Sequence, residues 1–175
     1  AQSQKISDLE QQVQALSGAK AYWQGKKWVA FGDSISAGFQ LDDPDTQLYS
    51  QLIAKDLGLQ LVSGSMHAMN SMGYTVNAGT AVGQHSMPAY VNADKNEDAD
   101  LVTIFAGTND FGRLVAMPLG TMADDANTES FYGRLKYTCD LLSTKYPNAL
   151  VILVTPLPRH DCADGTVGAK EPTKT

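Results

Sequence analysis

The sequence has few of the residues that build metal centres and disulfide frameworks. It contains only 2 cysteines, Cys139 and Cys162, and 3 histidines. None of them has the close ligand spacing that zinc sites use, so we expect no metal and no cofactor. The two cysteines leave open either one disulfide or two free thiols.

Long apolar runs and an excess of positive charge are also lacking. No run approaches the roughly 18 apolar residues of a membrane span, so we expect none. Lys and Arg number 13 against 19 Asp and Glu, a net charge of −6, which argues against a broad nucleic-acid-binding surface. The N-terminus is polar, and no signal peptide is visible. With 175 residues that are 43% apolar, the chain is suited to one packed domain of ordinary size.

Residues 1–24 differ from the rest of the chain. Ile6, Leu9, Val13 and Leu16 are spaced 3, 4 and 3 residues apart, which is the a/d seam of a heptad repeat. Two heptads are too short to form a stable coiled coil alone. The seam is therefore either one face of a helix lying on its own domain or, as we favour, an oligomerising stem. We expect a homo-oligomer through residues 6–16, with dimer and trimer both open.

From residue 26 onward, short apolar runs alternate with helical patterns. The expected strands are 27–31, 59–62, 101–105 and 150–154, and the expected helices are 46–57 and 128–145. Leu48, Leu52, Ile53 and Leu57 share one face of the first helix, and Thr128 is the expected N-cap of the second. We expect residues 94–100 to form a solvated acidic loop. Such alternation indicates an α/β domain with a parallel sheet, in which ligands bind beyond the carboxyl ends of the strands.

Two polar residues follow strands of this sheet. Ser34 comes after a Gly-Asp turn, where its hydroxyl could act as a nucleophile, although an N-cap serine would look the same. Asn109 follows the central strand, where its carboxamide could donate to an oxyanion or simply form an Asx turn.

Together, the strings around these two residues resemble the SGNH (GDSL) hydrolase family. Trp28–Ile35 (WVAFGDSI) is similar to the first conserved block of that family, and Asp100–Asp110 (DLVTIFAGTND) to its third. The resemblance extends from about residue 26 to residue 159. It implies a flavodoxin-like three-layer α/β/α fold and ester hydrolysis. Ser34 would be the nucleophile and a backbone oxyanion donor, and Asn109 would be the side-chain donor.

The second block of the family supplies a further backbone N–H, and the match there is poor. The stretch from Gly64 to Ala68 is the favoured position, and the glycine-containing stretch that ends at Gly83 is the alternative. Gly64, Ala68, Gly83 and Asp33 are therefore the candidate residues for oxyanion or substrate contacts.

The last block of the family, D-x-x-H, provides the general base and its orienting carboxylate, and it does not occur in this sequence. We therefore expect the domain to be C-terminally incomplete relative to the family, with the histidine on a missing segment or a second chain. His160, next to Asp161, is an alternative base. His67 could contact substrate, and His85 has no assignable role.

Two functions follow from these features. The favoured one is a serine esterase or deacetylase that acts on acylated carbohydrate or lipid. The alternative is a non-catalytic glycan- or receptor-binding module on an oligomeric stem, as in a phage tail protein or an adhesin. Either would suit an extracellular or virion-associated location.

Overall fold

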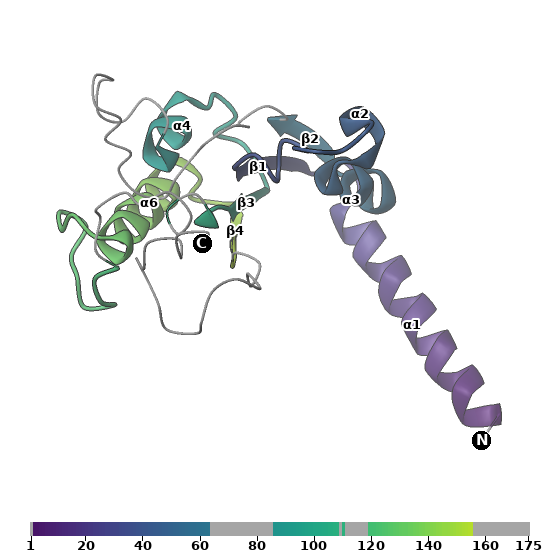
Figure 1. The fold of residues 1–175 in the computed structure, drawn as a ribbon. Coiled ribbons are helices and arrows are strands. Elements are labelled where there is room, and N and C mark those ends of the chain that lie inside the picture. The colour runs from purple at the N-terminus through teal and green to yellow at the C-terminus, as the bar shows by residue number, and fades with distance from the viewer. Residues whose placement is uncertain (1, 64–85, 109, 111–118, 156–175) are drawn as a thin grey trace, which may run out of the picture.

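A computed structural model shows an α/β domain behind a long N-terminal helix (Figure 1). It describes residues 2–63, 86–108, 110 and 119–155. The strands are β1 (Lys27–Gly32), β2 (Gln60–Ser63), β3 (Leu101–Phe105) and β4 (Leu150–Val154). The helices are α1 (Gln2–Trp23), α2 (Pro44–Gln47), α3 (Tyr49–Leu57), α4 (Met87–Ala93) and α6 (Phe131–Lys145).

The four strands form a parallel sheet in the order β2-β1-β3-β4. β1 and β3 lie in the middle and are almost entirely buried, as expected for central strands of a parallel sheet. Their pairing runs without a register shift from Trp28 opposite Leu101 to Gly32 opposite Phe105. The segments that leave β1 and β3 therefore begin side by side at the carboxyl edge of the sheet.

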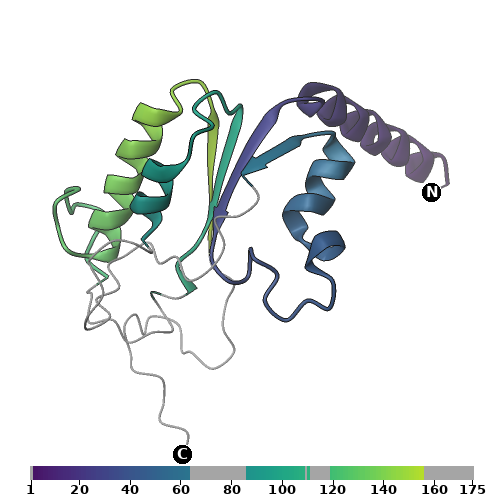
Figure 2. The same ribbon diagram turned by 90° about the horizontal axis from the view of Figure 1, so that it is seen from above.

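Helices cover both faces of the sheet (Figure 2). α4 and α6 lie on one face, over a core that includes Val29, Phe31, Val102 and Ile104. On the opposite face, α3 and the C-terminal end of α1 pack around Trp28. The indole of Trp28 donates a hydrogen bond to the buried hydroxyl of Thr103 over 3.0 Å. The predicted three-layer α/β/α architecture is confirmed.

The expected helix over residues 46–57 was partly wrong. Leu48 has an extended backbone (ψ 130°) and separates α2 from α3. Its side chain is buried, whereas Leu52 and Ile53 are 47% and 41% exposed. α3 instead buries Ser50 and Ala54. Because the helix is interrupted at Leu48, the apolar face predicted for one continuous helix over residues 46–57 does not apply.

Two further expectations need correction. α6 begins at Phe131 with Ser130, not Thr128, as its N-cap. The acidic loop that begins at Asp94 is only partly solvated, because Asp94 is 3% exposed and accepts a 2.9 Å hydrogen bond from the hydroxyl of Tyr146. α4, which the sequence analysis did not assign, starts at an N-cap serine, Ser86.

Candidate active site

The candidate site lies where the chain leaves β1 and β3. In the order β2-β1-β3-β4, the chain turns one way from β1 to β2 and the other way to β3, so the switch point of the sheet falls between β1 and β3. Ligands of open α/β sheets bind in the crevice at such a point. Ser34 follows β1, and Thr108 follows β3, both at this edge.

A tight turn places Ser34 at the surface. No helix begins there, so the N-cap interpretation of this serine is wrong. Backbone hydrogen bonds close the turn, from Ala37 N–H to the Asp33 carbonyl (3.0 Å) and from Phe39 N–H to the Ser34 carbonyl (2.9 Å). The Ser34 side chain is half-buried, in contrast to its buried neighbours Asp33 and Ser36.

The Asp33 carboxylate organises this turn from beneath. It is 1% exposed, and its Oδ1 accepts a 2.9 Å hydrogen bond from the N–H of Ile35. Burial raises the pKa of Asp33, while hydrogen bonds from the backbone of Ile35 and from the Thr108 hydroxyl oppose that rise. Within the described part of the chain, no hydrogen bond of standard geometry reaches the other oxygen, Oδ2.

The backbone N–H groups of this turn fall into two sets: those bonded to acceptors inside the turn, and that of Ser34, which is not. The N–H groups of Ile35, Ala37 and Phe39 all bond to acceptors inside the turn. Among the residues that the structure describes, none accepts a hydrogen bond from the N–H or the hydroxyl of Ser34. A nucleophile that also serves as a backbone oxyanion donor needs both groups available in this way.

Gly32 is required by the close approach of this turn to the end of β1. A Cβ on Gly32 would lie 1.9 Å from the Ser36 Oγ and 3.2 Å from the Phe105 carbonyl oxygen. Ser36 is itself held by Tyr49, with 3.3 Å between the two hydroxyl oxygens. Burial raises the pKa of Tyr49, and the charge of Asp33 adds to the rise, so Tyr49 remains a neutral phenol.

Ser36, Tyr49 and Thr108 were not singled out from the sequence. Ser36 is two residues from Ser34 and carries no motif of its own, and Tyr49 comes from a helix 13 residues further on. Only the fold brings Tyr49 and Thr108 to the turn. Gly107, which precedes Thr108, has φ 120°, a conformation that favours glycine and redirects the chain as it leaves β3.

Several predicted site residues lie outside the described residues, and their positions are not discussed. They are Asn109, Gly64, Ala68, Gly83, His67, His85, His160 and Cys162. Within the described ranges, no group of three or more His, Cys, Asp or Glu residues could hold a metal ion. Over the same ranges, no helix is long and apolar enough to cross a bilayer.

Solved structures share this fold. A proposed GDSL-like lipase from Bacteroides ovatus superposes with a TM-score of 0.60 at 18% identity, over 75% of this chain and 73% of that chain. A second, from Bacteroides uniformis, gives a TM-score of 0.56 at 19% identity, over 82% and 76%. Another structure, 23% identical with a TM-score of 0.61, is matched over only 58% of its own length. At these identities, the likeness shows the fold alone.

The sequence itself carries the assignment to a family. No protein of curated function matches it. The model of the GDSL-like lipase/acylhydrolase family, however, matches residues 30–172, most of the chain. The matched region includes the turn around Ser34 and the segment that leaves β3. The chain therefore belongs to the GDSL-like lipase/acylhydrolase family, that is, to the SGNH hydrolases, a family of esterase-type hydrolases.

Proposed function

We propose that this protein is a serine ester hydrolase with Ser34 as its nucleophile. The observation that carries the proposal is the turn after β1, in which the N–H and the hydroxyl of the half-buried Ser34 find no acceptor among the described residues, while the neighbouring N–H groups bond inward. In the first step, the Ser34 Oγ adds to the acyl carbonyl of an ester, the alcohol leaves, and an acyl-serine forms. Water then hydrolyses the acyl-serine and releases the acid.

The oxyanion of each tetrahedral intermediate needs several donors. We assign the N–H of Ser34 and the carboxamide of Asn109, with a third N–H from the stretch Gly64–Ala68 or from Gly83. What supports Asn109 is its position in the sequence, two residues after Gly107, which lies at the carboxyl edge of the sheet next to the Ser34 turn. Each such donor typically contributes a factor of about 10²–10³ in rate.

The reaction also needs a base that accepts the proton of Ser34. The sequence has no D-x-x-H, and its 3 histidines all lie outside the described residues. We propose that the base comes from a further segment or a second chain, with His160 as the alternative within this sequence. Asp33 is poorly suited to this task, because it is buried beneath the turn and bonded to its backbone.

Replacing Ser34 by alanine tests the nucleophile. We expect Ser34→Ala to abolish hydrolysis of an aryl acetate above the rate without protein, because no second hydroxyl occupies that position. Ser143→Ala is a matched control, since it removes an exposed serine hydroxyl on α6, remote from the sheet edge. The measurement is the release of nitrophenol, followed by absorbance.

Added imidazole extends this test to the missing base. If the base is absent, imidazole should accelerate turnover by the wild-type protein and by Ser143→Ala, but not by Ser34→Ala, after subtraction of the rate without protein. Equal rates for wild type and Ser34→Ala, with and without imidazole, would show that Ser34 is not the nucleophile.

We take the substrate to be an acylated carbohydrate or lipid. A second function, glycan or receptor binding without turnover, is favoured by the exposed apolar seam of α1, which suits a multivalent stem. The two functions differ in one observable. The wild-type protein would release acid from an acylated glycan if it is an esterase, whereas a binding module would bind the glycan and release no acid.

A further inference from the structure

The apolar seam of α1 has no partner among the described residues. Ile6, Leu9, Val13 and Leu16 are 54%, 51%, 62% and 68% exposed. α1 has 22 residues, about 33 Å of helix, and projects away from the sheet with its N-terminus at the far end (Figure 1). Its anchor is at the other end, where Trp23 packs beside the Trp28 core and Gly25 N–H bonds to the Gly58 carbonyl over 2.8 Å. The alternative of a helix lying along its own domain is therefore wrong for residues 6–16.

We propose that α1 pairs with α1 of a second copy of this chain, parallel and in register. With Ile6 and Val13 at a and with Leu9 and Leu16 at d, the seam keeps a strict heptad spacing over residues 6–16. A seam of this kind is self-complementary, so a second copy is the occupant that fits it without any further feature.

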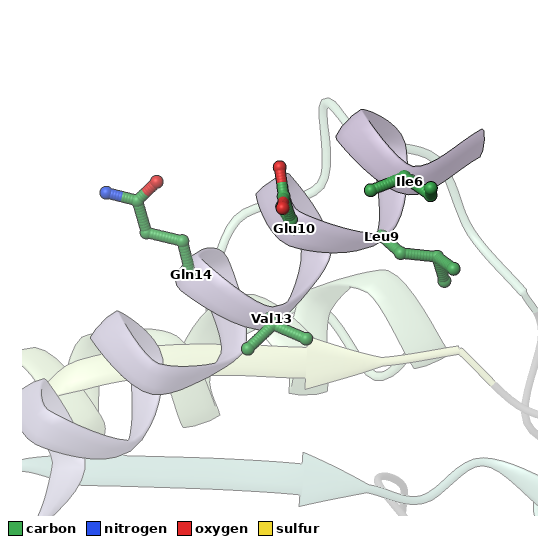
Figure 3. Close-up of a pocket in the computed structure, with 5 residues that line it drawn as sticks. All are labelled: Ile6, Leu9, Glu10, Val13 and Gln14. Atoms are coloured by element: carbon green, nitrogen blue, oxygen red, sulfur yellow. The ribbon is translucent and has the colours of Figure 1, made fainter. Parts of the chain in front are cut away.

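The surface of α1 already has the hollow that such a partner would fill. Ile6, Leu9, Glu10, Val13 and Gln14 line this open, shallow hollow (Figure 3). Ile6 is at an a position and Leu9 at a d position of the heptad. Glu10 is at the e position, and Val13 is at the a position of the next heptad. These four positions form the hole that receives a d-position side chain from a parallel partner helix. The partner's Leu9 is that side chain.

The charges beside the seam favour the parallel direction. Lys5 is at a g position, and Glu10 is at the e position of the following heptad. In a parallel, in-register pair, each g residue lies next to the e residue five positions later on the partner helix. Lys5 of each copy would therefore meet Glu10 of the other. An antiparallel pair would instead set e positions against each other and bring the two Glu10 carboxylates together.

Analytical ultracentrifugation of the full chain across micromolar to near-millimolar concentration tests the pairing. We expect a mass that rises above the 18.8 kDa of one chain with concentration, because two heptads pair weakly. Leu9→Glu should return the mass to 18.8 kDa, whereas Gln11→Glu, on the outer side of the same helix, should not. A wild-type chain that is monomeric throughout would overturn the proposal, as would an oligomer that persists in Leu9→Glu.

A charge swap tests the parallel register. Lys5→Glu and Glu10→Lys should each weaken association, and the double variant should restore it toward the wild-type dissociation constant. Single variants that associate as well as wild type, or a double variant that restores nothing, would overturn the register. All the substituted positions are exposed, so we expect every variant to fold. An unchanged near-ultraviolet circular dichroism spectrum would show that the domain is intact.

Discussion

At the scale of single residues, the most consequential group is the buried carboxyl of Asp33. This carboxyl supports the Ser34 turn by accepting a hydrogen bond from Ile35 N–H. Its burial also removes it from water, and this desolvation is the largest influence on the pKa of Asp33, raising it above the ordinary 3.8. A folded-state pKa that is raised means that the native protein binds this proton more tightly than the unfolded chain does. The stability that Asp33 contributes is therefore present at low pH and is lost as the pH rises through its folded pKa.

Asp33→Asn should make this dependence visible. Asparagine keeps an oxygen that can accept the hydrogen bond from Ile35, but it carries no charge. We expect the free energy of unfolding of the variant, relative to wild type, to rise as the pH increases above the ordinary pKa of 3.8, because only the wild type has to ionise a buried group. Urea unfolding at several pH values measures it.

Asp98→Asn provides a control of opposite sign. Asp98 is exposed and pairs with Lys27, and the hydrogen bond from Lys27 lowers the pKa of Asp98. The stability from this pair is present above the ordinary pKa and is lost as the pH falls. A similar pH dependence for both variants would contradict our account of Asp33.

At the scale of elements, α6 shows how a helix start is chosen. Both Thr128 and Ser130 can cap a helix, but the Ser130 hydroxyl accepts a 3.0 Å hydrogen bond from Gly133 N–H and donates to the Asp124 carboxylate. Thr128 instead donates to Asp125 over 3.3 Å. A Cβ on Gly133 would lie 2.3 Å from the Thr128 carbonyl oxygen, so the preceding loop packs directly on the first turn of the helix.

Ser130→Ala should therefore destabilise the protein more than Thr128→Ala does. Loss of an N-cap side chain costs about 0.5–2 kcal/mol, and the Asp124 carboxylate would lose a donor as well. Thr128→Ala removes only a partly exposed hydrogen bond, and we expect a cost below about 0.5 kcal/mol. Urea denaturation of the two variants beside wild type gives the comparison, and equal costs would contradict the assignment of the cap.

At the scale of the whole molecule, the centre of the sheet and its β4 edge differ in burial. The central strands are buried on both faces, whereas β4 is an edge strand whose apolar side chains are largely exposed. Leu150, Ile152, Leu153 and Val154 are 40–50% exposed. Among the described residues, α3 covers the sheet over β1 and β2 and leaves the same face of β4 open (Figure 2).

A pair of alanine substitutions on neighbouring strands tests this asymmetry. Leu101 and Leu150 are direct partners across β3 and β4 on the face that α3 covers, with exposures of 6% and 50%. Leu101→Ala should cost about 2–5 kcal/mol, as for other buried aliphatic residues, and Leu150→Ala less than about 2 kcal/mol. Equal costs in urea denaturation would mean that further protein covers β4 in solution.

The sequence by itself determined the strands, the fold class and the family. The strands were predictable to within one residue because each is a short, contiguous apolar run that needs no distant partner to be recognised. The Ser34 and Asn109 strings are equally local. The substrate, the base and the roles of the site residues stay predictions.

Tertiary structure decided what depends on contacts between distant segments. It broke the helix at Leu48 to bury that side chain, and it buried the Asp94 carboxylate because Tyr146, 52 residues away, supplies a donor. It also brought Tyr49 and Thr108 to the turn around Ser34. Periodicity reports only which residues share a face, and packing against the rest of the chain chooses the face and its partners.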